Sequence, residues 1–337
     1  MNIEYRTLNI EYRTLNDEVL SRADSSKTAI LQCSAMNVQC SIFPPFSFLT
    51  LFPSLPSFRT LCVGTNCFIA LLVLTAMLFL QSYSLQAQSL QEIYSGLENA
   101  TSLYVTQNEI YVVEQGKNRL LKLDHAGKLL ETIGGKGSGN YQFSKPIDVD
   151  ATNGLKVFVT DYNNRRVQVF DKRGQYLSSI AGKGTFGNTR RYNPTQVAVN
   201  GLGEVFFVDE SENYIRRFDL DSNLLDEFRI PGEVESIDEM NVTSREIVLL
   251  DKSSATIHRL SLNGSYDGFY VANGVSAIFA NDLGVWSLND DSIQFESQTK
   301  EKKSISFSSK NKAVDLQVLD KYIFILTPKE LYRISVQ

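Results

Sequence analysis

Lys156–Ile180 reads KVFVTDYNNRRVQVFDKRGQYLSSI, and this stretch decides the fold class. Apolar residues recur at every second position in two runs, and a third run follows Asp-Lys-Arg-Gly. Alternation with a period of two, interrupted by Asn, Asp and Gly, is typical of half-buried strands joined by tight turns. The stretch therefore predicts a meander of three antiparallel strands, and no helical period competes with it.

Looser copies of the pattern lie on both sides of this stretch. Glu109–Ile133 reads EIYVVEQGKNRLLKLDHAGKLLETI, and Glu204–Ile230 reads EVFFVDESENYIRRFDLDSNLLDEFRI. One residue ends the second strand of each unit and serves as a register marker; the six markers are Glu114, Asp161, Asp209, Asp251, Asn289 and Thr327.

The spacing of the markers predicts the architecture. Repeats of roughly 40 to 50 residues are expected when each unit is a four-stranded propeller blade. A β-sandwich is the alternative for regular short strands, but sandwiches do not repeat one sequence pattern at blade length. We therefore expect an all-β, six-bladed β-propeller of four-stranded antiparallel blades over residues 88–337.

The ends of the repeat region predict how the ring closes. The sixth unit has room for three strands only, Val314–Leu319, Tyr322–Thr327 and Glu330–Val336, while Leu90–Tyr94 precedes the first blade without another partner. Closure removes exposed sheet edges. We expect this N-terminal strand to supply the missing outer strand of the sixth blade.

The first sixty residues do not resemble a domain. Asn2–Leu8 is repeated without change at Asn9–Leu15, and Ile42–Phe58 crowds four prolines among Phe and Leu. Neither a helix nor a central strand tolerates that proline pattern. We expect residues 1–60 to be a disordered leader, or a product of a start site assigned too far upstream.

Residues 61–87 carry an export signal or a membrane anchor. Phe68–Leu80 is an apolar run with Arg59 before it and Leu85-Gln-Ala87 after it, an order typical of a signal peptide cleaved close to Gln88. The run is shorter than the roughly 20 residues that span a bilayer. The alternative is an uncleaved anchor over Leu61–Leu80. Both readings place the repeats outside the cytoplasm, as a periplasmic, secreted or cell-surface domain.

Charge and cysteine content restrict the function. The chain has 33 Lys and Arg against 38 Asp and Glu, and the charges of the first 87 residues cancel, so the excess of acid belongs to the repeats. A mildly acidic domain is a poor binder of polyanions, so we expect no nucleic-acid partner. All four cysteines, Cys33, Cys40, Cys62 and Cys67, precede the cleavage site, which leaves the exported domain without disulfide or thiol chemistry.

Two segments resemble a known family. Val159–Phe170 (VTDYNNRRVQVF), followed by Asp-Lys-Arg-Gly, and the link Gly134–Phe143 (GGKGSGNYQF) are similar to the NHL repeats of six-bladed propellers. The likeness is good in the first two units, fair in the third and lost after Arg259. It implies the propeller fold, but it leaves function open, because such propellers range over protein, RNA, sugar and peptide recognition and some enzymes.

We expect a non-catalytic propeller that binds a protein, peptide or glycan. Because strands alternate in direction within a blade, the loops between the second and third strands share one face with the links between blades; we call it the linker face. Long loops on a rigid scaffold are where recognition sits, and Tyr and Arg often anchor interfaces. The candidate partner-binding residues are Tyr162, Arg190, Arg191 and Tyr192. Tyr141 and Phe143 are instead expected to wedge between blades.

The alternative is an extracytoplasmic metal-dependent hydrolase or lyase with a site near the propeller axis. The resemblance implies it, because some relatives of the fold are lyases with zinc histidines and others are lactonases with axial carboxylate and Asn ligands. His125 falls in a turn on the far face and His258 in a third strand, so we expect no shared histidine site. We expect the polar residues near the first strands to be solvated channel or turn residues; they are Asp148, Asn200, Glu235 and Asp315. No catalytic residue, metal ligand or cofactor is assigned.

Overall fold

The computed structural model describes residues 90–152, 154–185, 188–307 and 311–336. The described residues belong to the second of the two units into which the chain divides, Gln86–Gln337. The leader, Phe68–Leu80 and Leu61–Leu80 lie outside the described residues. Within the described ranges, no helix combines the length and the apolar character that crossing a bilayer would need.

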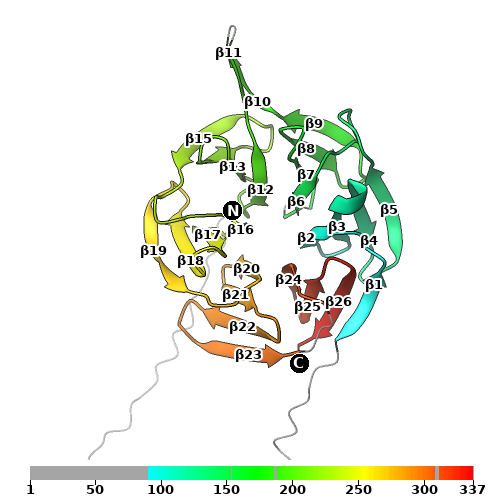
Figure 1. Cartoon of the computed structure of the whole chain (residues 1–337), viewed down its shortest axis with the longest axis vertical. Coiled ribbons are helices and arrows are strands. Elements are labelled where there is room, and N and C mark those ends of the chain that lie inside the picture. Colours follow the sequence, from blue (N-terminus) through cyan, green and yellow to red (C-terminus); the bar gives the residue numbers. More distant parts are fainter. Residues whose placement is uncertain (1–89, 153, 186–187, 308–310, 337) are drawn as a thin grey trace, which may run out of the picture. The chain divides into compact units, whose positions relative to one another are not determined.

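Six four-stranded antiparallel sheets form a ring in the second unit, which confirms the predicted fold class (Figure 1). The strands of the first three blades are β2 (Ala100–Val105), β3 (Ile110–Glu114), β4 (Arg119–Leu123) and β5 (Leu129–Gly134); β6 (Pro146–Asp150), β7 (Lys156–Asp161), β8 (Arg166–Asp171) and β9 (Tyr176–Ile180); and β12 (Pro194–Val199), β13 (Val205–Asp209), β14 (Tyr214–Phe218) and β15 (Leu224–Arg229).

The later blades keep the same strand order although the repeat signature fades in the sequence. Blade 4 is β16 (Glu239–Val242), β17 (Glu246–Asp251), β18 (Thr256–Ser261) and β19 (Tyr266–Val271); blade 5 is β20 (Ala277–Asn281), β21 (Gly284–Leu288), β22 (Ser292–Ser297) and β23 (Lys302–Ser306). Blade 6 contains β24 (Asp315–Leu319), β25 (Tyr322–Leu326) and β26 (Glu330–Ser335).

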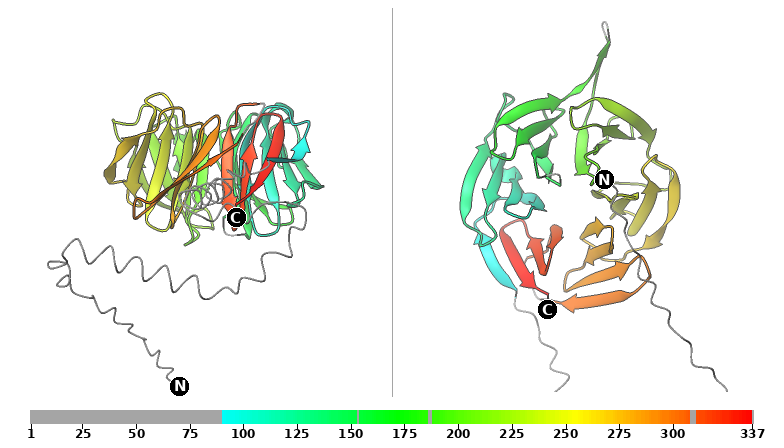
Figure 2. Two further views of the ribbon diagram at one scale, coloured as in Figure 1. Left: turned by 90° about the horizontal axis from the view of Figure 1, so that it is seen from below. Right: turned by 180° about the vertical axis from the view of Figure 1, so that it is seen from behind.

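The ring closes as predicted. β1 (Gln91–Ser95) pairs antiparallel with β26, from Gln91 opposite Arg333 to Ser95 opposite Glu330, and completes blade 6. Figure 2 shows β1 and β26 side by side at the outer edge of the ring. A strand from the start of the domain thus covers the edge that the end of the chain would expose.

The hydrophobic core lies between neighbouring blades, and alternate residues of one strand belong to different parts of it. On the fully buried strand β3, Ile110 and Val112 belong to a cluster that includes Phe324 of blade 6. Their neighbours Tyr111 and Val113 belong to the next cluster, with residues of blade 2. Successive side chains of a strand point to opposite faces, so each second strand contributes to the two inter-blade cores beside it.

The register markers tie each blade to the link that precedes it. Glu114, Asp161, Asp209, Asp251 and Thr327 have no exposed surface. In blades 1 to 4 the marker carboxylate accepts a backbone N–H from the end of the link: Glu98 N to Glu114 Oε1 at 2.9 Å, Ser144 N to Asp161 Oδ1 at 2.7 Å, Asn193 N to Asp209 Oδ1 at 2.9 Å and Glu235 N to Asp251 Oδ2 at 2.8 Å.

The third strand balances the charge of the marker in three of these blades. Arg119 contacts Glu114, and Arg166 Nε lies 2.9 Å from Asp161 Oδ2. In blade 3 the residue opposite Asp209 is Tyr214, and the guanidinium comes from Arg216, whose Nε lies 2.8 Å from Asp209 Oδ2. A buried carboxylate is costly without a partner. An arginine therefore pairs with the marker in blade 3 as well, although it stands two residues further along the third strand than in blades 1 and 2.

The link between blades 2 and 3 folds in a way that we did not predict. It forms a hairpin of β10 (Gly182–Thr185) and β11 (Asn188–Arg191), which pair only with each other. The hairpin projects from the ring in both face-on views (Figures 1 and 2). The sequence GKGTFGNTRR lacks the alternating apolar residues of the blade strands, so periodicity did not predict strands here.

Candidate functional site

Tyr162 lies on the linker face where blades 2 and 3 meet. Its hydroxyl donates a hydrogen bond to Glu210 Oε2 at 2.8 Å, and Lys145 Nζ lies 4.3 Å from the centre of its ring. Asn193 Nδ2 donates to the same Glu210 oxygen at 2.9 Å. The side chain is half-buried, so Tyr162 joins the two blades and keeps an accessible edge.

Tyr192 is not a surface residue, and its assignment as a partner contact is wrong. Only 2% of its surface is exposed. Its ring centre lies 5.4 Å from that of Phe207 and 6.1 Å from that of Phe218, and the Arg216 guanidinium lies 4.5 Å from it. The aromatic face covers the buried arginine, which is a favourable place for a planar cation.

The position of Tyr192 could have been found in the sequence. It directly precedes Asn193, whose N–H reaches the marker Asp209, just as Phe143 precedes Ser144. Phe143 is fully buried between blades 1 and 2, which confirms the wedge expected for it. Tyr141 is 40% exposed and contacts Phe170 and Tyr176 of blade 2.

Exposed basic side chains gather around the same part of the linker face. Arg191 is exposed at the base of the hairpin, opposite Gly182, and the backbone register pairs Arg190 with Lys183. Loop contacts bring the first link to the 2–3 loop of blade 2: Tyr162 N donates to Lys145 O at 3.3 Å, and Asn164 Nδ2 donates to Gly137 O at 2.9 Å. We define the basic patch as Lys136, Lys145, Arg165 and Arg191, all exposed and none in an ion pair with a described residue.

The second candidate region is the axial channel. The innermost strands β2, β6, β12, β16, β20 and β24 surround the centre of the ring (Figure 1). They line a cavity of about 470 Å³. That volume lies within the range of small-molecule sites.

Three carboxylates take the same position on the innermost strands of alternate blades. They are Asp148 in blade 2, Glu239 in blade 4 and Asp315 in blade 6. The strand register shows that the positions are equivalent. In each blade the residue that follows the carboxylate is paired with the residue two positions before the register marker. The pairs are Val149 with Val159, Met240 with Leu249, and Leu316 with Ile325.

Each of these carboxylates bridges to the next blade. The acceptor oxygens and backbone donors are Asp148 Oδ2 with Val197 N at 2.8 Å, Glu239 Oε2 with Ile278 N at 2.8 Å, and Asp315 Oδ2 with Leu103 N at 2.6 Å. Asp150 makes a similar bridge to Val199 N at 3.1 Å. These bonds join inner strands that are not paired in one sheet.

Burial raises the pKa values of these groups. It raises the pKa of Asp148 to about 6 and that of Asp150 to about 7. Burial also raises the pKa values of Asp315 and Glu239, and the charge of Asp148 adds to both shifts. A low-dielectric site disfavours the charged form of a carboxyl group.

The expectations for the channel are partly confirmed. Asp148 and Asp315 line it, although Asp315 is only 7% exposed. Asn200 is a buried turn residue whose amide bonds to Glu204, and Glu235 accepts a bond from Ser253 Oγ at the linker side of blade 4. Glu239 was not predicted as a channel residue, although counting back from the marker Asp251 would have located it.

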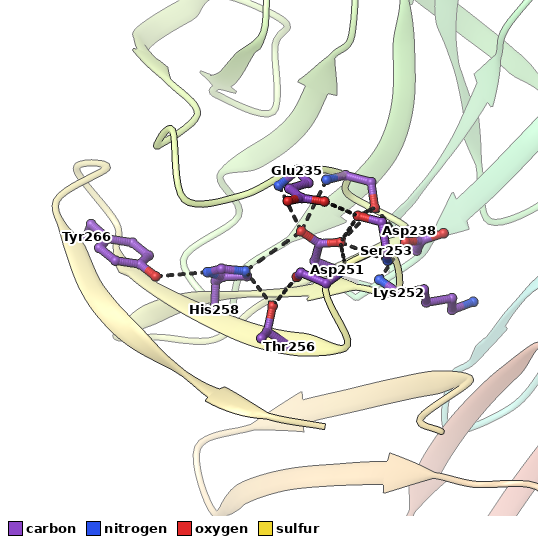
Figure 3. Close-up of polar contacts among 10 residues, drawn as sticks. Glu235, Asp238, Asp251, Lys252, Ser253, Thr256, His258 and Tyr266 are labelled. Atoms are coloured by element: carbon purple, nitrogen blue, oxygen red, sulfur yellow. Dashed lines mark hydrogen bonds and ion pairs between the residues drawn. The ribbon is translucent and has the colours of Figure 1, made fainter. Parts of the chain in front are cut away.

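His258 belongs to a polar cluster in blade 4, not to a metal site. Its ring nitrogens contact Thr256 Oγ1 at 2.8 Å and Tyr266 OH at 2.9 Å, and Nε2 lies 3.9 Å from Asp251 Oδ2 (Figure 3). Burial lowers the pKa of His258. Burial alone would raise the pKa of Asp251. Hydrogen bonds to its carboxylate, of which the bond from Ser253 has the largest effect, instead hold this pKa well below its usual range.

The cluster does not form a nucleophilic triad. The hydroxyl of Ser253 donates to Asp251 Oδ1 at 2.6 Å and makes no bond to His258. His125 lies elsewhere, in contact with Thr106 O at 2.8 Å. Across the described ranges, no group of three or more His, Cys, Asp and Glu side chains is arranged to hold a metal ion.

Residues 143–170, which cover the end of the first link and most of β6, β7 and β8, match the NHL repeat model. The chain carries an NHL repeat. The matched segment includes the marker Asp161, its partner Arg166 and the wedge Phe143. The contacts that hold blade 2 to its link are therefore those of the repeat itself.

Two similar curated proteins carry NHL in their names. The chain is 36% identical over 87 residues to human NHL repeat-containing protein 3, a match that covers 24% of this chain and 25% of that protein. It is 35% identical over 74 residues to the human E3 ubiquitin-protein ligase NHLRC1, covering 22% of this chain and 19% of the ligase. The matches thus span a quarter or less of these relatives.

Solved propellers resemble the whole ring. A catalytically inactive virginiamycin B lyase from Staphylococcus aureus, crystallised with quinupristin, superposes with a TM-score of 0.52 over 74% of this chain and 99% of the lyase. The sequence identity is 13%. This likeness concerns the fold alone.

Proposed function

We propose that this protein is a non-catalytic binding propeller, and that its linker face at blades 2 and 3 holds an acidic segment of a protein partner. The observation that carries the proposal is the basic patch beside the projecting hairpin. Its four side chains are exposed and make no ion pair with a described residue. Sites of unbalanced charge on a rigid surface favour partners of opposite charge.

The charge of the patch is opposite to that of the whole chain. The formal net charge is −5, yet Lys136, Lys145, Arg165 and Arg191 gather around two links. A local field of opposite sign to the net charge raises the rate of encounter with an acidic segment and orients it. It also repels basic partners.

Hydrogen bonds hold the patch in place before a partner arrives. Lys145 N donates to Asn118 Oδ1 at 2.8 Å, and Arg166 Nη2 donates to Gly139 O at 2.8 Å. Tyr162 N donates to Lys145 O. Preorganised loops lose little conformational entropy on binding.

The comparisons support a protein as the partner. One relative is an E3 ubiquitin-protein ligase, and Tyr162, with one accessible edge beside Lys145 and Arg165, suits a peptide surface with apolar and acidic side chains. A glycan without acidic groups would leave the basic patch unpaired.

Binding of a synthetic Glu-rich peptide tests the proposal. We expect saturable binding that weakens as salt is added, since exposed charges are screened. The double variant Lys136→Glu and Arg191→Glu should weaken binding about tenfold or more, the change expected for loss of about 1.4 kcal/mol.

Lys303→Glu is the matched control, because Lys303 is exposed on the outer strand of blade 5. It makes one such change of a basic residue to Glu, half of the charge change of the double variant, away from the patch. Equal weakening by Lys303→Glu, or unchanged binding of the Glu-rich peptide by the double variant, would reject the acidic-partner proposal.

We also propose that the propeller acts outside the cytoplasm. The support is the order of Arg59, the apolar run Phe68–Leu80 and the small residue Ala87. N-terminal sequencing of the protein from its host should find no residue before about 80. An intact chain in a membrane fraction would favour the anchor Leu61–Leu80, and an intact chain in the cytosol would contradict export.

A further inference from the structure

Carboxyl groups strongly outnumber basic groups in the axial channel. Among its described lining residues, Lys252 is the one basic side chain. Six carboxylates share the lining with it: Asp148, Asp150, Asp238, Glu239, Asp282 and Asp315. The linker face outside the channel has the opposite local charge, so the two regions suit different ligands.

The structural role of the carboxylates does not account for their charge. Asp148, Asp150, Glu239 and Asp315 each accept a backbone N–H of the next blade, but a neutral side chain can do the same. Asn241 Oδ1 accepts Ala280 N at 3.0 Å, and in blade 1 Ser102 Oγ accepts Val149 N at 3.3 Å. Ionised carboxylates are costly to bury. If these bridges served stability alone, Asn or Ser at the same positions would give a more stable ring.

Two largely buried glutamines line the same channel without a side-chain hydrogen-bond partner among the described residues. Gln196 is 9% exposed and Gln317 is 8% exposed, and both line the cavity. Neither side-chain amide makes a hydrogen bond to a described residue. Both side chains face the channel, so a ligand or solvent that fills the space between the strands would supply the hydrogen bonds that they lack.

We propose that the axial channel binds an organic ammonium cation, through the carboxylates of alternate blades and the amide oxygens of Gln196 and Gln317. An ammonium group has three N–H donors and no acceptor. It therefore matches a channel in which carboxylate and amide oxygens are the available groups.

The arrangement of the acceptors favours an organic cation over a metal ion. The described carboxylates do not converge as a metal-binding group, but they stand on different blades around a cavity of about 470 Å³. A cation with a carbon chain can place its donors several ångströms apart. It would also supply the counter-charge that these buried groups lack, since the nearest base in the lining is Lys252.

Lys252 lies at the linker-face end of the channel. It belongs to the 2–3 loop of blade 4, where its backbone N–H donates to Asp238 Oδ2 at 2.9 Å. Figure 3 shows its side chain extending away from the cluster around Asp251. Its charge acts on Glu239 and Asp315, so Lys252 competes with a bound cation.

Calorimetric titration with two matched probes tests the proposal at about pH 8, where Asp148 and Asp150 are ionised. The probes are 1,4-diaminobutane and its neutral isostere 1,4-butanediol. We expect binding of the diamine and none of the diol. Glu239→Gln should weaken diamine binding about tenfold or more, since a hydrogen bond to a charged group is lost. Lys252→Ala should strengthen it.

Glu301→Gln, at an exposed position in blade 5, is the control and should bind the diamine as the wild type does. A Gln side chain keeps the acceptor for Ile278 N, and thermal melts report whether Glu239→Gln stays folded. A lysine-containing peptide distinguishes a free amine from a partner's side chain as the source of the cation. Equal binding of diamine and diol, no diamine binding, or equal effects of Glu239→Gln and Glu301→Gln would overturn the proposal. The outcome is independent of the peptide test of the linker face.

Discussion

Buried side chains near the links decide which residues of the linker face can bind a partner. Tyr192 and Arg191 are neighbours, but Tyr192 lies in the core between blades 2 and 3 while Arg191 is exposed. Tyr192→Ala should lower the free energy of unfolding by about 3 kcal/mol, the cost of truncating a buried aromatic residue. Arg191→Ala should change it by about 0.5 kcal/mol or less. Urea denaturation measures both, and equal losses would mean that the two side chains share one environment.

The channel carboxylates make stability depend on pH. The folded state holds the proton of Glu239 more tightly than the unfolded chain does, because burial raises the pKa of this group well above 4.5. Stability from this group is therefore present at low pH and is lost as the pH rises through 4.5 toward the folded-state value. Glu239→Gln should raise the melting temperature at about pH 8 relative to wild type and change it little at about pH 4. A variant that is less stable than wild type at about pH 8 would contradict this.

A residue could be assigned from the sequence when the residues around it in the fold are also its neighbours in the chain. The markers Glu114, Asp161, Asp209 and Asp251 were found because they end strands in a repeated pattern. Glu239 was missed because its significance depends on Asp148 and Asp315, which are remote in sequence and meet only around the closed ring. Tyr192 was misplaced because a Tyr beside two arginines reads as surface, whereas Arg216 and the Phe residues of blade 3 enclose it.

Strand β1 is the element on which closure depends. Its pairing with β26 was predictable, because the last unit lacked a fourth strand and Leu90–Tyr94 had no other partner. A chain that begins at Ala100 should aggregate or lose cooperative unfolding, since the edge of β26 is then exposed. A chain that begins at Gln86 is the control. Identical melting curves for the two chains would show that β1 does not close the ring.

The β10–β11 hairpin was not predictable from periodicity, and we expect it to contribute to binding more than to stability. Its two strands pair with each other and with no blade strand. Replacing Lys183–Arg190 by a short Gly-Ser link should therefore change the free energy of unfolding by about 1 kcal/mol or less, in the range of surface changes. The same replacement should weaken binding of the Glu-rich peptide, measured by fluorescence polarisation. A large loss of stability would mean that the hairpin supports blades 2 and 3.

At the scale of the whole molecule, the propeller separates charge between two regions. The basic patch lies on the linker face at blades 2 and 3, and the carboxylates lie around the axis. Six blades from one repeated pattern were predictable, because each blade buries the same alternating positions against its neighbours. The distribution of charge was not, because it arises from loops and inner strands that differ between blades.

Hydrogen exchange of backbone amides tests the central claim that the linker face at blades 2 and 3 is the binding surface. Exchange is compared with and without the saturating Glu-rich peptide, and slower exchange reports amides that the partner covers or orders. We predict slower exchange in Gly134–Lys145, in the loop after Asp161 and in the hairpin Gly182–Arg191, with no change in the outer strand β23. Protection confined to other blades, or spread evenly around the ring, would contradict the account.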